Sequence, residues 1–295
     1  MTSTLRRAIR LTRLGLHLAL GVAIVQLAYP LLGARRRATL RRRWCRGVLA
    51  ALGVRLQLVG AAPAHPVLIA ANHLSWLDIF AIGAALPCTF VSKEDARAWP
   101  IVGWLALHNG TLFLRRNSAR AVHRVKGEVA ARLAQSETVV VFPEGTTSEG
   151  ASVLPFSPAL FQAALDAASR VLPLAVQYYD HEARRTSEAA YVGDDPLWKS
   201  LRAVLDAPSI HVHLFFGDCL QGKTRRELAR LAHHAVLRLH SPVPQPRRHL
   251  VHHPRAGVEG EIVPGGRMRA QRHSPGSGEI FGAAPVDKAI AASGE

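Results

Sequence analysis

A histidine and an aspartate five residues apart, His73 and Asp78, are the strongest candidates for chemistry in this chain. They follow the apolar run Val67–Ala71, which predicts a buried strand with His73 at its carboxyl end. Neutral imidazole is the usual side chain for removing a proton from a hydroxyl near neutral pH. A carboxylate that accepts from the other ring nitrogen fixes the tautomer and stabilises the imidazolium. Asp78, in the first turn of a helix expected from Ser75 to about Leu86, could serve His73 in this way.

The same residues also fit a structural role. Ser75 and Asp78 have the spacing of a capping box, in which Asp78 closes the helix N-terminus. A histidine at the end of a strand is often an ordinary hydrogen-bonded residue. Because the two roles are compatible, the pattern alone leaves both catalysis and capping open.

A second polar segment follows a β-branched run that ends in proline. The run Val139–Phe142 predicts another buried strand, and Pro143 closes it. The polar loop Glu144–Ser148 would then lie at the carboxyl end of the strand, where ligands gather in α/β sheets. Gly145 would let backbone amides approach an oxygen-rich ligand, and Glu144 could bind a hydroxyl. The alternative is an ordinary Glu-Gly turn.

Cations stand at the ends of two further apolar runs. Arg115 and Arg116 follow Leu112–Leu114, and adjacent side chains on a strand point to opposite faces, so one arginine could enter a cleft. A guanidinium suits a phosphate because it offers a planar fork of donors. Lys93 ends the run that begins at Cys88 and is a second candidate for an anionic head group. The alternative is that all three are solvated surface residues.

In this order and spacing, the motifs resemble the sequence blocks of the glycerolipid acyltransferase family, typified by 1-acylglycerol-3-phosphate acyltransferase. The His-x4-Asp block of that family is matched by His73 and Asp78. Its Gly-x-x-Phe-hydrophobic-x-Arg block is matched by Gly110, Phe113 and Arg116. Its Phe-Pro-Glu-Gly-Thr block is matched by Phe142 through Thr146, and a proline-centred apolar block by Val171–Ala175. The resemblance covers about residues 67–216.

The resemblance implies a reaction and a set of roles. His73 would deprotonate the free hydroxyl of an acceptor lipid, Asp78 would orient His73, and the hydroxyl would attack the thioester of acyl-CoA or acyl-carrier protein. The residues implied in substrate binding are Arg116, Arg115, Lys93, Glu144, Gly145 and Thr146. The family resemblance implies no covalent acyl-enzyme, no metal and no cofactor beyond the acyl donor.

The expected acceptor is 1-acylglycerol-3-phosphate (lysophosphatidic acid), which would give phosphatidic acid. One departure bears on this expectation. Many family members that use this acceptor carry arginine after Glu-Gly-Thr, and this chain has Thr147 there. The Thr-Ser variant also resembles bacterial acyltransferases that act on lyso-ornithine lipid, as does the segment from Tyr191 to Trp198, so that acceptor is the alternative. A more distant alternative is a non-catalytic basic protein that binds membranes or nucleic acid.

The composition narrows the class of protein. The chain has 295 residues, 48% of them hydrophobic, which is enough for one catalytic domain with extensions. Its three cysteines have no paired spacing, so a disulfide framework or a zinc site is not expected, and all three are interpreted as apolar fillers. The formal net charge of +16 indicates an anionic partner. Because arginines gather beside an apolar stretch, anionic membrane lipids are expected rather than nucleic acid.

That apolar stretch, residues 14–32, is about long enough to span a bilayer as a helix. Arginines flank both of its ends, and the larger cluster, residues 35–46, follows it. We expect a retained anchor in the cytoplasmic (inner) membrane with the catalytic domain facing the cytoplasm, and a cleaved signal peptide is the alternative. The segment Thr39–Gly53 is expected as an interfacial helix, with a helix packed on the catalytic domain as the alternative.

Short β-rich runs alternate with helical stretches through the middle of the chain, which predicts an α/β sandwich. With the family resemblance, the expectation is a mixed β-sheet flanked by helices behind an N-terminal membrane-anchoring helical region. The expected divisions are a membrane anchor with a basic segment (1–47), a catalytic domain (48–241) and a disordered tail (242–295). Ile210–Phe216 is predicted as an edge-like strand. Its His211 and His213 share a face but have no acidic or cysteine partner nearby, so no metal site is expected there.

Overall fold

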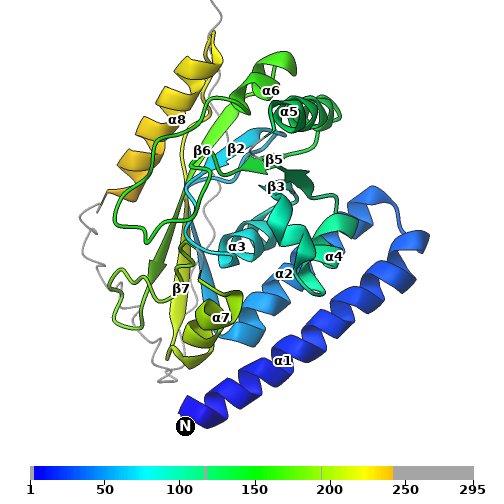
Figure 1. Ribbon diagram of the computed structural model, residues 1–295, viewed down its shortest axis with the longest axis vertical. Helices are drawn as coiled ribbons and strands as arrows, with labels where there is room; N and C mark the ends of the chain where they lie inside the picture. Colours follow the sequence, from blue (N-terminus) through cyan, green and yellow to red (C-terminus); the bar gives the residue numbers. More distant parts are fainter. Residues whose placement is uncertain (1–2, 116–117, 194, 242–295) are drawn as a thin grey trace, which may run out of the picture. The chain divides into compact units, whose positions relative to one another are not determined.

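The computed structural model describes residues 3–115, 118–193 and 195–241, which form a seven-stranded sheet with helices on both faces (Figure 1). The strand order is β1-β7-β6-β2-β5-β3-β4. Pairing is parallel throughout except between β6 and β7. The expected mixed sheet is therefore confirmed. The strands are β1 (Val54–Val59), β2 (Leu68–Ala71), β3 (Thr89–Lys93), β4 (Leu112–Leu114), β5 (Val139–Val141), β6 (Val171–Tyr179) and β7 (Ile210–Phe216).

Two apolar clusters cover the two faces of the sheet. Side chains alternate along each strand, so in β2 Ile69 joins one cluster, and Leu68 and Ala70 join the other. The first cluster is closed by α2 (Ala34–Leu52), α3 (Leu77–Ala85) and α7 (Leu197–Asp206), with Leu14 of α1 (Ser3–Ala23) at its margin. The second is closed by α5 (Ala119–Ala134), α6 (Phe161–Asp166) and α8 (Arg225–His240).

The parallel strands bring distant segments to one edge of the sheet. β5 pairs with β2 on one side and with β3 on the other, all in the same direction. The segments that follow these three strands therefore emerge side by side. They carry His73 after β2, Lys93 at the end of β3 and Phe142–Thr147 after β5. A short 3₁₀ helix (Glu94–Ala98) and α4 (Val102–His108) continue from β3 along this edge.

The N-terminal helix lies along the α2 and α7 side of the domain (Figure 1). Residues Ser3–Leu31, which comprise α1, a π-helical turn and a 3₁₀ turn, are long and apolar enough to cross a membrane by length and composition. Arg7 binds the Asp206 carboxylate through Nε (2.6 Å) and through Nη2 (2.7 Å). Arg10 donates to the carbonyls of Val204, Leu205 and Ala207 at the end of α7. At the far end of the helical segment, the Tyr29 hydroxyl donates to Asn109 at 2.7 Å.

The helix expected at a membrane interface packs instead on the domain. α2 buries Val48, Leu49 and Leu52 in the first cluster, each at 3% exposure or less. The expected division between residues 47 and 48 falls within this helix and stays a prediction. The apolar face of α2 that suggested an interface is therefore the face that contacts α3 and the sheet.

Three smaller expectations are corrected by the structure. β7 is not an edge strand, because β1 pairs with it on one side and β6 on the other. The sequence from Pro158 to Ser169 predicts a single helix, whereas α6 covers only Phe161–Asp166. Cys219 is exposed, so the interpretation of the cysteines as apolar fillers holds only for Cys45 and Cys88. The tail predicted from residue 242 lies outside the described residues.

Candidate active site

The loop that carries His73 is held in place by its neighbours in the sheet. Asn72 is buried, and its side chain donates to the Val176 carbonyl (3.0 Å) and accepts from the Val176 amide (2.7 Å) of β6. The backbone carbonyl of His73 accepts from the Ser148 amide at 2.9 Å. The chain therefore leaves β2 in a direction fixed by both adjacent strands.

His73 and Asp78 meet as their spacing predicts. The Nδ1 atom of His73 lies 2.8 Å from Oδ2 of Asp78, which is fully buried in the first turn of α3. The same oxygen accepts from the backbone amides of Leu74 (2.8 Å) and Ser75 (3.0 Å). Asp78 thus caps the loop and binds the imidazole at once. A carboxylate on Nδ1 makes that nitrogen the donor and leaves Nε2 able to accept a proton.

Tyr178, which the sequence did not single out, completes the surroundings of Asp78. Tyr178 belongs to β6 and lies 100 residues after Asp78 in the chain. Its hydroxyl donates a hydrogen bond to Oδ1 of Asp78 at 2.6 Å. Burial, followed by the neighbouring Asp78 charge, raises the pKa of Tyr178 well above its ordinary value, so the hydroxyl keeps its proton and acts as a donor. The carboxylate of Asp78 therefore receives hydrogen bonds at both oxygens.

Glu144 links two loops instead of facing the cavity. Its Oε1 accepts from the backbone amide of His73 (2.9 Å), and its Oε2 accepts from the amide of Leu154 (3.2 Å). Burial raises the pKa of Glu144 to about 7, although these two hydrogen bonds act in the opposite direction. The expected role in shaping the acceptor pocket is supported indirectly, through the position of the His73 backbone.

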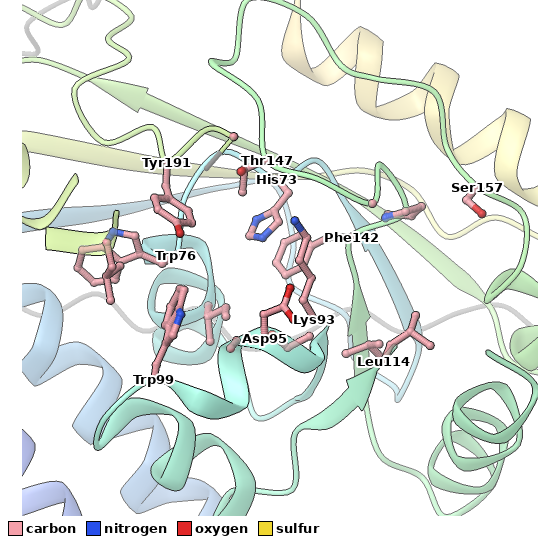
Figure 2. A pocket seen from close by; sticks show the side chains of 18 of the residues that line it. His73, Trp76, Lys93, Asp95, Trp99, Leu114, Phe142, Thr147, Ser157 and Tyr191 are labelled. Atoms are coloured by element: carbon pink, nitrogen blue, oxygen red, sulfur yellow. The ribbon is translucent and has the colours of Figure 1, made fainter. Parts of the chain in front are cut away.

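His73 opens onto a cavity of about 680 Å³ at the strand ends (Figure 2). Phe142 forms one wall and stacks on the imidazole, with ring centroids 3.9 Å apart and an angle of 16° between the planes. Trp76, Trp99 and Tyr191 line the opposite part, and Trp99 meets Tyr191 edge to face. The part of the chain that the structure describes gives Nε2 of His73 no hydrogen-bond partner. A substrate hydroxyl could occupy that position.

The structure places some of the other predicted substrate-binding residues at the cavity and others away from it. Lys93 and Gly145 line the cavity, and Figure 2 shows the Lys93 side chain reaching toward His73. Thr147 lines it too, whereas Thr146 is not among the lining residues. Arg115 is exposed and does not line the cavity. Arg116 lies outside the described residues, so its role stays a prediction.

A second, apolar cavity adjoins the first. It has a volume of about 180 Å³ and extends under α1 and α2, where Leu14, Leu18 and Val48 line it. The two cavities share lining residues, which are Trp76, Ile79, Ser92, Ala96, Trp99 and Leu197. Two adjacent cavities of this kind suit a molecule with a reactive polar centre and a hydrocarbon chain.

The described residues contain no group of three or more His, Cys, Asp or Glu side chains placed to hold a metal ion. His211 and His213 on β7 pack within the sheet, where the His213 ring lies 4.4 Å from that of Tyr179.

Comparisons with known proteins agree with this geometry. The sequence profile of the family described as Acyltransferase matches residues 54–177. The lyso-ornithine lipid O-acyltransferase of Pseudomonas aeruginosa is 40% identical over 235 residues, which cover 78% of this chain and 89% of that protein. The 1-acyl-sn-glycerol-3-phosphate acyltransferase of Neisseria meningitidis is 45% identical over 148 residues, or 50% of this chain. The match spans only 58% of the length of that Neisseria protein.

The fold also has a counterpart among solved structures. The 1-acyl-sn-glycerophosphate acyltransferase of Thermotoga maritima superposes with a TM-score of 0.55 at 21% sequence identity. The superposition covers 79% of this chain and 96% of the other. The likeness extends beyond the sheet and supports the arrangement of the strand ends described above.

Proposed function

Because the chain belongs to the acyltransferase family, we propose that it is a membrane-bound O-acyltransferase that moves a fatty acyl group from a thioester donor to the free hydroxyl of a lysophospholipid. The observation that carries the proposal is the His73–Asp78 pair beside a cavity that shares part of its wall with an apolar one. This arrangement places a base between a polar chamber and space for a hydrocarbon chain.

The proposed reaction uses the groups of the dyad in turn. Nε2 of His73 takes the proton of the acceptor hydroxyl while its oxygen attacks the thioester carbonyl. The new ester C–O bond forms, the C–S bond breaks, and the thiolate that leaves takes the proton from the imidazolium. Asp78 stabilises the imidazolium between these steps. The donor is acyl-CoA or acyl-carrier protein.

Lysophosphatidic acid is the first candidate acceptor. Its phosphate needs a cation near the hydroxyl, and Lys93 lines the cavity on the β3 side. Arg116 is proposed as a further contact on the basis of the family motif. The name of the Neisseria relative is in accord with this acceptor.

Lyso-ornithine lipid is the second candidate, and the cavity wall favours it in one respect. Thr147 lines the cavity where a basic residue would assist a phosphate, and Asp95 lines it together with Lys93. An ornithine head group carries both an ammonium and a carboxylate, so a lysine and an aspartate in one chamber suit it. The Pseudomonas relative, which matches over most of its length, bears that name.

We propose that the enzyme lies at the cytoplasmic membrane with the catalytic domain facing the cytoplasm. The helical segment Ser3–Leu31 contacts the domain near both of its ends and turns a row of leucines outward, namely Leu16, Leu20, Leu27 and Leu31. A helix held in this way fits immersion in one leaflet beside the domain. The exposed Arg35, Arg36 and Arg37 at the start of α2 would bind anionic lipid head groups.

The proposal is tested by acyl transfer in membranes that contain either wild type or His73→Ala, with a labelled acyl donor. Lysophosphatidic acid and lyso-ornithine lipid are offered in parallel. We expect His73→Ala to lower turnover by at least about 10³-fold with whichever lipid the wild type accepts. Unchanged turnover in the variant would overturn the mechanism. If product forms from only one of the two lipids, that lipid is the acceptor.

A further inference from the structure

A groove on the α8 side of the sheet presents three basic side chains close to the catalytic cavity. The groove has a volume of about 340 Å³ and lies between α8 and the loop before α6. Arg226, Arg230 and His233 line it at positions i, i+4 and i+7 of α8, so their side chains project from one face of the helix. Pro155, Phe156 and Pro158 form the opposite wall.

The positive charge of this groove is not neutralised by neighbouring acids. Arg226 and Arg230 are exposed and form no ion pair with the residues that the structure describes. Glu227, the acid in the first turn of α8, accepts from the backbone amide of Lys223 at 2.8 Å. The His233 ring packs edge to face on Phe156. Two guanidiniums one helical turn apart beside an imidazole suit the oxygens of a phosphate group.

One stretch of chain separates the groove from the catalytic cavity. In residues 155–160, the side chains of Pro155, Phe156 and Pro158 line the groove. Those of Ser157, Ala159 and Leu160 line the cavity. Figure 2 shows Ser157 on the side of the cavity that lies toward α8, the pale yellow helix. The backbone amide of Ser157 donates to the Pro143 carbonyl at 2.9 Å, which ties this wall to the loop after β5.

The groove and the apolar cavity flank His73 from the two faces of the sheet. α8 belongs to the second apolar cluster, whereas α1 and α2 belong to the first (Figure 1). A thioester donor has the same polarity, with a hydrocarbon chain on one side of its reactive carbon and a phosphate-bearing arm on the other. Of the described residues that line the catalytic cavity, Lys93 is the only lysine or arginine. The donor phosphates therefore need cations beyond that cavity.

We propose that Arg226 and Arg230, beside His233, bind the phosphate of the phosphopantetheine arm of the acyl donor. This inference rests on the proposed acyl-transfer function. The arm crosses the wall formed by residues 155–160, the thioester lies at His73, and the acyl chain extends toward the apolar cavity. Coenzyme A and acyl-carrier protein share this arm, and separate measurements with each donor distinguish them.

The test compares two double variants of the full chain in membranes. Arg226→Gln with Arg230→Gln removes both guanidiniums of the groove. Arg225→Gln with Arg238→Gln removes the same charge from exposed positions of the same helix that do not line it. We expect the first pair to raise the donor KM at least about tenfold, equivalent to about 1.4 kcal/mol. The kcat and the acceptor KM should stay within about twofold, and the second pair should leave all three values unchanged.

The outcomes separate the possible sources of the phosphate. A rise in KM for both donors supports binding of the phosphate that their arms share, whereas a rise confined to acyl-CoA or to acyl-carrier protein overturns it. An unchanged KM for both donors, or an equal rise in the Arg225 and Arg238 variant, overturns the proposal. Absence of acyl transfer by the wild type with either donor would instead refute the function on which the proposal rests, so the two failures are distinguishable.

Discussion

Two carboxylates, Asp78 and Glu144, support the His73 loop from two neighbouring strand ends, and they differ in the number of hydrogen bonds that they accept. Asp78, in the turn after β2, accepts four hydrogen bonds, three at one oxygen and one at the other. Glu144, in the loop after β5, accepts two, and burial raises its pKa to about 7. The two carboxylates therefore differ in how many hydrogen bonds compensate for their burial. Asp78 is equipped to stabilise an imidazolium, whereas Glu144 is equipped to hold two backbone segments together.

The largest effect should follow from the loss of the Asp78 charge. Asp78→Asn keeps the size of the side chain but replaces one acceptor oxygen by an amide donor, which can favour the wrong tautomer of His73. We expect kcat to fall about 10³- to 10⁴-fold while the fold is retained. The measurement is acyl transfer at saturating substrates, with circular dichroism of the purified variant.

Asp166→Asn is the matched control, because Asp166 is a surface acid whose nearest described base, Lys126, lies 3.9 Å away. Its kcat should equal that of the wild type. A kcat of Asp78→Asn within tenfold of the wild type would mean that the carboxylate only caps the loop.

A pH-dependent effect should follow from Glu144. Because its folded-state pKa is raised, its contribution to stability is fully present below about pH 4.5 and is lost as the pH rises through about 7. Glu144→Gln has no proton to lose there. The free energy of unfolding of wild type relative to this variant should therefore decline between these pH values, by about 2 to 3 kcal/mol. Thermal unfolding at a series of pH values measures this difference.

Glu137→Gln serves as the comparison, because Glu137 is a glutamate near the start of β5 that pairs with Arg132 at the surface. It should show no such decline over the same range. If the free energies of unfolding of wild type and Glu144→Gln change with pH in parallel, ionisation of Glu144 does not destabilise the fold. The contrast with Asp78 would then be wrong.

The smallest effect should come from Tyr178→Phe. This change removes one of the four hydrogen bonds to Asp78 and leaves the contact with His73 intact. We expect a loss of about 1 to 2 kcal/mol in stability and a decrease in kcat of less than about tenfold. Denaturant unfolding and steady-state kinetics measure the two quantities.

Tyr179→Phe is the neighbouring control, since its hydroxyl binds Gln177 and does not contact Asp78. A loss of kcat in Tyr178→Phe as large as that in Asp78→Asn would show that Tyr178 is needed to keep the carboxylate in place.

The sequence predicted the local parts of this site. The pairing of His73 with Asp78 follows from their spacing, because a strand end and the first helical turn lie within five residues. Tyr178 could not be found in this way, because only the pairing of β2 with β6 brings it to Asp78. The role of Glu144 was also hidden, since a side chain that binds backbone amides leaves no second residue type to recognise.

In the fold, too, local elements could be predicted from the sequence, whereas long-range pairings could not. The bounds of α8 follow from its amphipathic pattern and its Thr224 cap, and they were predicted correctly. β1 was not predicted, because Val54–Val59 mixes buried and exposed positions and follows a helix directly. The alternation of polar and apolar residues along β7 indicated an edge strand, but β1 pairs with it. Which strand lies at an edge depends on pairings between distant segments, and no local pattern contains that information.

The contacts of Arg7 and Arg10 also bear on how the protein is made. Their partners in residues 204–207 are separated from them by more than 190 residues. At ordinary rates of synthesis those partners leave the ribosome about 10 to 40 seconds after the arginines. Throughout that interval Leu14 and Leu18, which line the apolar cavity in the folded protein, lack the α7 part of their surroundings. A lipid bilayer is one surface that would cover them. The catalytic domain would then be assembled on a helix that already lies in the membrane.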